Sequence, residues 1–158
     1  MSSQCATLVV IEYGASWPKW LEPSGAGYLC VVAQHYEGQP TSLIGQVANR
    51  IARLELQGWL LGTSVIVANH RTDSDAFAAR SVLARGLLAR LRRQHQGELV
   101  LTVDDRASPR SCQDLAGLAA ALDGDAVGSG AGVSVRIGKN APLHGAASDY
   151  VDQHRATA

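Results

Sequence analysis

The sequence predicts a three-layer, doubly wound α/β domain, in which a mostly parallel five-stranded sheet carries helices on both faces. Residues 63–68 form a nearly unbroken apolar run with β-branched side chains, which is typical of a central parallel strand buried on both faces. Amphipathic segments separate this run from similar ones. Four predicted strands also begin 35 residues apart, near Tyr28, Thr63, Glu98 and Val133. That interval fits a β-α-β unit, so right-handed crossovers are expected.

Length and charge limit the partners of this domain. The chain of 158 residues is predicted to hold one α/β domain in residues 1–138, followed by a poorly ordered tail in residues 139–158. Its composition, 46% apolar and 18% charged, is that of an ordinary soluble protein. The 14 basic residues balance 14 acidic ones, which leaves no positive surface to attract nucleic acid. We therefore expect no nucleic-acid partner.

Cysteine usage and hydropathy indicate a reducing compartment. The three cysteines are Cys5, Cys30 and Cys112, with no Cys-x-x-Cys pair, so neither a disulfide framework nor a zinc site is indicated. Cys30 lies in an apolar run, as expected of a buried reduced thiol. The N-terminus has no signal-peptide pattern, and no apolar run reaches the roughly 18 residues that a membrane span needs. These features predict a cytoplasmic protein without a membrane partner.

The first two strands are predicted at residues 7–12 and 27–34, with about 14 residues between them. This length is close to the minimum of roughly a dozen residues for a parallel crossover. The sequence therefore favours a parallel pair with a stunted helix near Pro18 over an antiparallel pair. Trp17 and Trp20 lie in the same segment. Either at least one of them covers the sheet where the helix is too short, or they form an exposed aromatic patch typical of interfaces.

Two long helices are predicted next. The first begins near Thr41 or Ser42, either of which can cap it, and ends at Gly58. Its apolar face consists of Leu43, Ile44, Val47, Ile51 and Leu54. The second is expected to be capped by Asp75 and to run to about Arg93. Its apolar face consists of Phe77, Leu83, Ala84, Leu87, Leu88 and Leu91.

The last third of the chain predicts two strands and the helix between them. The strands are expected at residues 98–103 and 133–137. Ser108 followed by Pro109 is a typical helix start, and Gly124 is expected to end that helix. No covering helix is predicted after residues 133–137. Because exposed edge strands tend to pair, we expect a homodimer through this edge.

The order of these elements resembles the universal stress protein family. That family has five parallel strands, with a long helix after strand two, a polar turn and a helix after strand three, and a last helix before strand five. Residues 43–57 resemble the long helix, residues 63–75 strand three with its turn, and residues 98–105 strand four. The resemblance rests on element order and spacing, and it extends over most of residues 7–138.

The sequence departs from the nucleotide-binding members of that family where they bind phosphate. Those members carry a Gly-x2-Gly-x9-Gly-Ser/Thr pattern after strand four, whereas this chain has Asp104, Asp105 and Arg106 there. Two carboxylates would repel phosphate. The family's aspartate at the end of strand one corresponds at best to Glu12. The resemblance therefore does not carry ATP binding over to this chain, and no cofactor is expected.

Polar side chains leave the carboxyl ends of four predicted strands, which is where open parallel sheets bind ligands. The candidate ligand-binding residues are Glu12, Tyr13, His35, Asn69, His70, Arg71, Arg80, Asp104, Asp105 and Arg106. In an enzyme, His70, Asp104 and Asp105 would be the catalytic candidates, acting on a metal or as general acid and base. The favoured alternative is that strand ends simply become polar where they leave the core. No catalytic residue and no metal site is assigned.

Arg80 falls at the centre of the apolar face of the second helix, where an unpaired charge is costly. One interpretation is that its side chain extends past the sheet edge into solvent. The other is that it binds an anion or pairs with an aspartate. If Arg80 is buried, the nearest expected acidic partners are Asp104 and Asp105.

Together these features predict a stress-protein-like domain that acts as a non-catalytic binding or interaction module. Its expected partners are a second copy of the chain and a small-molecule ligand. Two other functions compete with this one. They are a small metal-dependent hydrolase that uses His70, Asp104 and Asp105, and a nucleotide-binding protein with a non-standard site.

Overall fold

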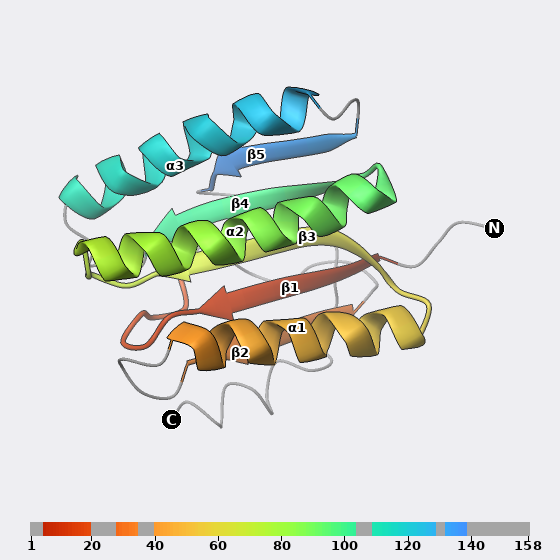
Figure 1. Ribbon diagram of the computed structural model, residues 1–158. Coiled ribbons are helices and arrows are strands. Elements are labelled where there is room, and N and C mark those ends of the chain that lie inside the picture. The colour runs from red at the N-terminus through yellow and green to blue at the C-terminus, as the bar shows by residue number, and fades with distance from the viewer. Residues whose placement is uncertain (1–4, 20–27, 35–39, 104–108, 129–131, 139–158) are drawn as a thin grey trace.

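The protein is an α/β domain with a five-stranded parallel sheet, as the sequence predicts (Figure 1). The computed structural model describes residues 5–19, 28–34, 40–103, 109–128 and 132–138. In chain order the elements are β1 (Cys5–Ile11), β2 (Tyr28–Ala33), α1 (Pro40–Leu56), β3 (Leu60–Ala68), α2 (Ser74–Gln94), β4 (Gly97–Val103), α3 (Pro109–Gly128) and β5 (Val133–Ile137). No helix in these ranges has the length and apolar character needed to cross a membrane.

The strand order β2-β1-β3-β4-β5 creates a switch point in the sheet. From β1 the chain moves outward to β2, then crosses back over β1 to β3, and it continues in that direction to β5 (Figure 1). All neighbouring strands are parallel, which confirms the parallel interpretation of β1 and β2. The direction changes between β1 and β3, so ligand binding is expected at the carboxyl ends of these two strands.

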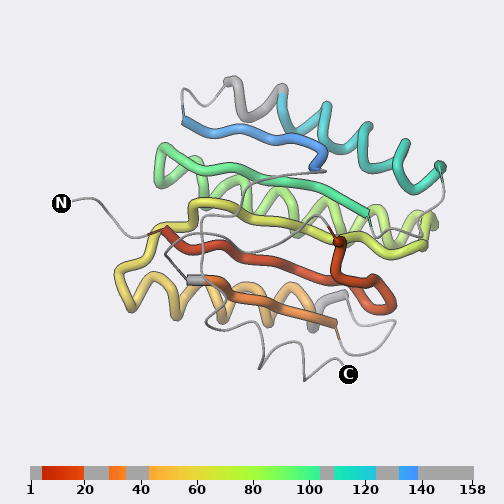
Figure 2. The backbone as a smooth tube through the Cα atoms, turned by 180° about the vertical axis from the view of Figure 1, so that it is seen from behind, coloured from red at the N-terminus to blue at the C-terminus, as the bar shows by residue number. Residues whose placement is uncertain are grey.

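Helices α1, α2 and α3 all pack on one face of the sheet (Figures 1 and 2). Register places Leu8, Cys30, Ile66, Leu99 and Val135 on this face, where they form one apolar cluster with buried leucines of the three helices. The sequence predicted helices on both faces. The difference follows from crossover handedness, because the three crossovers from β2 to β5 run in one direction across the sheet and right-handed connections then place their helices together.

The opposite face carries the alternate strand residues. Val9, Val31, Val65 and Val100 are fully buried there. Within the described residues, Ala15 and Trp17 from the segment after β1 pack against this cluster. The finding confirms that at least one of the two tryptophans covers the sheet, whereas Trp20 lies outside the described residues. None of the three cysteines forms a disulfide, and Cys30 is buried as expected.

Several element ends differ from the sequence prediction. Asp73, not Asp75, caps α2, because its Oδ1 accepts a hydrogen bond of 2.9 Å from the backbone N–H of Ala76. Helix α3 continues through Gly124 to Gly128, since one helical glycine costs only about 1 kcal/mol relative to alanine. Phe77 is 40% exposed instead of buried. It lies in the first turn of α2, which extends past the tip of β4 (Figure 1).

Candidate functional site

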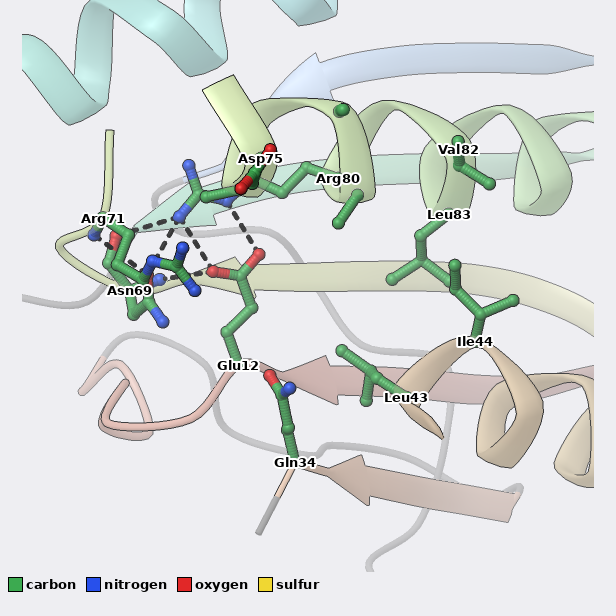
Figure 3. A pocket seen from close by; sticks show the side chains of 13 residues that line it. Glu12, Gln34, Leu43, Ile44, Asn69, Arg71, Asp75, Arg80, Val82 and Leu83 are labelled. Atoms are coloured by element: carbon green, nitrogen blue, oxygen red, sulfur yellow. Dashed lines mark hydrogen bonds and ion pairs between the residues drawn. The ribbon is translucent and has the colours of Figure 1, made fainter. Parts of the chain in front are cut away.

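The site lies at the carboxyl ends of β1 and β3, at the switch point of the sheet (Figure 3). Glu12 follows the last residue of β1, and Asn69 follows the last residue of β3. Arg80 comes from the second turn of α2, whose N-terminus begins close to the same strand ends. The end of β1 thus meets the end of β3 and the start of α2, which are 57 and 68 positions away in the chain, and their polar side chains come to one place.

A buried ion pair connects these segments. The Arg80 Nε donates to Glu12 Oε2 at 2.7 Å, and Arg80 Nη2 donates to Glu12 Oε1 at 2.9 Å. Only 3% of the Arg80 side chain and 10% of the Glu12 side chain are exposed. The sequence left open whether Arg80 extends into solvent or pairs with a carboxylate, and the structure shows the buried pair. Its carboxylate partner among the described residues is Glu12 at the end of β1, which the sequence did not name, whereas the predicted partners Asp104 and Asp105 lie outside the described residues.

Asn69 completes the network and fixes the turn after β3. Its Oδ1 accepts from Arg80 Nη2 at 2.9 Å and from the backbone N–H of Arg71 at 3.0 Å. Its backbone N–H donates to Glu12 Oε1 at 3.0 Å, and its Nδ2 donates to the Tyr13 carbonyl at 2.8 Å. Both the oxygen and the nitrogen of the Asn69 side chain thus have partners, as a buried amide requires. The network holds the ends of β1 and β3 against α2.

A second arginine pair lies at the mouth of the site. Arg71 Nε and Nη2 donate to the two carboxylate oxygens of Asp73 at 2.8 and 3.0 Å. The hydrogen bond from Arg71, helped by the bond from the Ala76 backbone, lowers the pKa of Asp73 from 3.8 to about 2. The helix cap is therefore an ionised carboxylate at neutral pH. This pair is far more exposed than the Glu12–Arg80 pair.

A cavity of about 450 Å³ opens between the first turns of α1 and α2 and the ends of β1 and β3 (Figure 3). Its polar end is formed by Glu12, Gln34, Asn69, Arg71, Asp75 and Arg80. Its apolar wall is formed by Leu43 and Ile44 of α1 and by alanines, Val82 and Leu83 of α2. Pockets of this size with an apolar lining and a few convergent polar groups are typical of small-molecule sites.

The structure brings four of the predicted site residues together, namely Glu12, Asn69, Arg71 and Arg80. The Tyr13 side chain is 41% exposed, and only its backbone joins the network. His70 is exposed and does not line the cavity. The other four predictions fall outside the described residues: His35, Asp104, Asp105 and Arg106.

Sequence reasoning missed most of the apolar wall and two polar residues. Gln34 follows β2 directly, and its Oε1 accepts a hydrogen bond of 3.4 Å from the Tyr13 N–H. Its place at a strand end was a signal that could have added it to the candidates. Asp75 was taken for a helix cap and instead lines the cavity. Val82 is 57% exposed and gave no periodic signal.

The described residues give no support for a metal site. Within them, no three histidine, cysteine, aspartate or glutamate side chains gather as a metal site would require. The carboxylate best placed for such a role, Glu12, is already paired with Arg80.

Comparison with family models, with curated proteins and with solved structures finds no match to this chain.

Proposed function

We propose that the protein is a small cytosolic, stress-protein-like domain that binds a small molecule without transforming it. The cavity at the switch point is the proposed binding site. One observation carries this proposal, which is that a mostly apolar cavity of about 450 Å³ lies where parallel sheets bind their ligands. The resemblance in element order to universal stress proteins supports the same kind of role.

The polar chemistry of the cavity favours binding over catalysis. A general acid or base needs a group that is available to the substrate and titrates near the working pH. Glu12 instead shares both oxygens with Arg80, and Arg71 shares two donors with Asp73. These pairs are suited to holding a rigid shape around a ligand.

The competing enzyme hypothesis depends on His70, Asp104 and Asp105. His70 is exposed outside the cavity lining, and both aspartates lie beyond the described ranges. A metal-dependent hydrolase would need these three side chains to meet. An increase in melting temperature of several degrees with Mn²⁺ would favour that function over ours.

A blocked cavity tests the binding proposal. Ala79 is half-buried in the lining, so Ala79→Trp should fill the cavity while the sheet stays folded. Ala120→Trp, at an exposed position of α3, is the matched control. We expect a fragment library in ligand-observed NMR to yield binders that bind the wild type and Ala120→Trp but not Ala79→Trp. Fragments that bind Ala79→Trp as well as the wild type, or the absence of any binder, would contradict the proposed site.

The proposed ligand is not ATP. Asp104 and Asp105 stand in the sequence where nucleotide-binding relatives of the stress-protein type have glycines. Both arginines of the cavity are already paired with carboxylates. Calorimetry with ATP and Mg²⁺ should therefore show no binding, and a micromolar dissociation constant would overturn this part of the proposal.

We also propose a homodimer through β5. At the two ends of the β4–β5 ladder, the Gly132 carbonyl accepts from the Gly97 N–H, and the Gly138 N–H donates to the Leu101 carbonyl. Because backbone groups alternate in direction along a strand, those of Val133, Val135 and Ile137 point away from β4. They make no hydrogen bond within the described part of the chain. At the other edge of the sheet, Leu29 and Val31 of β2 are fully buried. The β5 edge is thus the better template for pairing.

The dimer is tested at Ile137, whose side chain is 46% exposed on that edge. A lysine on an edge strand opposes strand pairing. Light scattering at tens of micromolar should therefore show a dimer for the wild type and a monomer for Ile137→Lys. Leu56→Lys changes a side chain that is 88% exposed at the end of α1, and it should stay dimeric. A monomeric wild type would count against the proposal.

A further inference from the structure

We propose that the cavity selects a small organic cation, an ammonium group attached to a short apolar body, over neutral or anionic molecules of the same shape. This inference rests on the proposed binding function and adds the chemical class of the ligand. The charges that line the cavity and the shape of its apolar wall carry the argument.

The positive charges of the cavity are already neutralised. The Arg80 guanidinium is held by both oxygens of Glu12, and the Arg71 guanidinium by both oxygens of Asp73. In a bidentate pair of this kind, two N–H groups of the guanidinium donate to the two oxygens of the carboxylate. An anionic ligand would have to compete with these internal carboxylates for either arginine.

One negative charge in the lining is left over. Asp75 lies in the first turn of α2, is exposed, and makes no ion pair or hydrogen bond within the described ranges. Asp73, which does not line the cavity, neutralises Arg71, and Glu12 neutralises Arg80, so Asp75 leaves a sum of minus one over the described charged side chains of the site. At the N-terminus of α2, the ionised cap Asp73 accepts the hydrogen bond from the Ala76 N–H, whereas Asp75 lies in the first turn without such a bond.

The apolar wall leads away from this charged end. Figure 3 shows Leu43 and Ile44 of α1 facing Val82 and Leu83 of α2, while the polar side chains gather at the strand ends. Val82 is 57% exposed, so a ligand lying along the wall would remove apolar surface from water. A ligand with a charged head and a short apolar chain matches both ends.

A series of three molecules with the same chain tests the selection. Pentylamine, 1-pentanol and pentanoate are titrated into the whole protein at neutral pH, and amide chemical shifts give the dissociation constants. We expect pentylamine to bind about two- to fivefold more tightly than 1-pentanol, which is the range of an exposed ion pair. Pentanoate should bind most weakly. Added salt should weaken pentylamine alone.

Removal of the carboxylate identifies its source. Asp75→Asn should abolish the preference of the cavity for pentylamine over 1-pentanol. Asp123→Asn removes the same charge from an exposed position of α3 outside the cavity lining, and it should keep the preference.

The outcomes separate the inference from the function on which it rests. If 1-pentanol binds but pentylamine does not bind more tightly, the cation selection is wrong and the proposed binding site stands. The same conclusion follows if Asp75→Asn keeps the preference for pentylamine. If pentanoate binds best, the charge argument is also wrong. If none of the three molecules binds and Ala79→Trp behaves like the wild type towards the fragment library, both the inference and the proposed function fail.

Discussion

Two arginine–carboxylate pairs near the start of α2 have the same bidentate form and differ in burial. In the Glu12–Arg80 pair, 10% and 3% of the two side chains are exposed, whereas in the Asp73–Arg71 pair the values are 48% and 29%. The closest contacts, 2.7 and 2.8 Å, are nearly equal. Hydrogen-bond geometry alone would predict that the two pairs stabilise the fold equally. Their energetics should differ because solvent still screens one pair and has been removed from the other.

The pairs also connect different parts of the molecule. Arg80 joins α2 to the residue after β1 and to Asn69 after β3, across 68 and 11 positions of sequence. The Arg71–Asp73 pair joins residues that lie only two positions apart in the chain. Loss of the buried pair should therefore weaken tertiary packing at the switch point. Loss of the exposed pair should affect only the start of one helix.

The largest expected effect follows from breaking the buried pair on one side. Arg80→Ala leaves the Glu12 carboxylate in the interior without its partner, so the free energy of unfolding should fall by about 3–5 kcal/mol. Arg85→Ala, at an exposed position of the same helix, should change it by less than about 0.5 kcal/mol. Denaturant unfolding measures both. Similar midpoints for the two variants would mean that Arg80 is solvated in solution.

Removal of both charges should recover much of that loss. In the double variant Glu12→Gln with Arg80→Leu, no charge is left in the interior, and the oxygen of the introduced amide can still accept from the Asn69 N–H. We expect a net loss of about 1–2 kcal/mol, the cost of hydrogen bonds lost at Asn69. If the double variant is as unstable as Arg80→Ala, the cost comes from lost packing of the arginine stem and not from an isolated charge.

The contrast between the two pairs also marks what sequence could predict. Periodicity predicted the parallel sheet, and the starts of β2 and β5 at Tyr28 and Val133 agree with the prediction. The helical position of Arg80 marked it as either extended into solvent or buried with a partner, and the structure shows that it is buried. Its partner could not be predicted, because Glu12 is 68 residues away and becomes adjacent only when β1 and β3 pair.

The apolar wall of the cavity was hidden for a related reason. Leu43 and Leu83 read as ordinary core residues in their own helices, and their shared cavity exists only after α1 and α2 pack side by side. Asp73 and Asp75 were confused because either can cap a helix. Only the observed hydrogen bond to the Ala76 N–H distinguishes the two.

A smaller effect is expected at the exposed pair when the pH falls. The pKa of Asp73 is about 2 in the folded protein, against the ordinary value of 3.8 that applies to the unfolded chain. A lowered folded pKa gives stability that is present above the unfolded value and is lost as the pH falls towards the folded one. The melting temperature of the wild type should therefore drop more steeply than that of Asp73→Asn between pH 3.8 and about 2. Parallel curves would contradict the role of this carboxylate.

The smallest effect is expected for Arg71→Ala. The substitution removes the largest cause of the lowered Asp73 pKa, but the cap itself remains because the Ala76 N–H still donates to Asp73 Oδ1. At neutral pH the melting temperature should change far less than in Arg80→Ala, since an exposed pair contributes little. In NMR titration the Asp73 pKa should rise towards 3.8. If Arg71→Ala destabilises the protein as much as Arg80→Ala, burial is not what separates the two pairs. In that case Arg71 would have to be counted as part of the network that holds β1, β3 and α2 together.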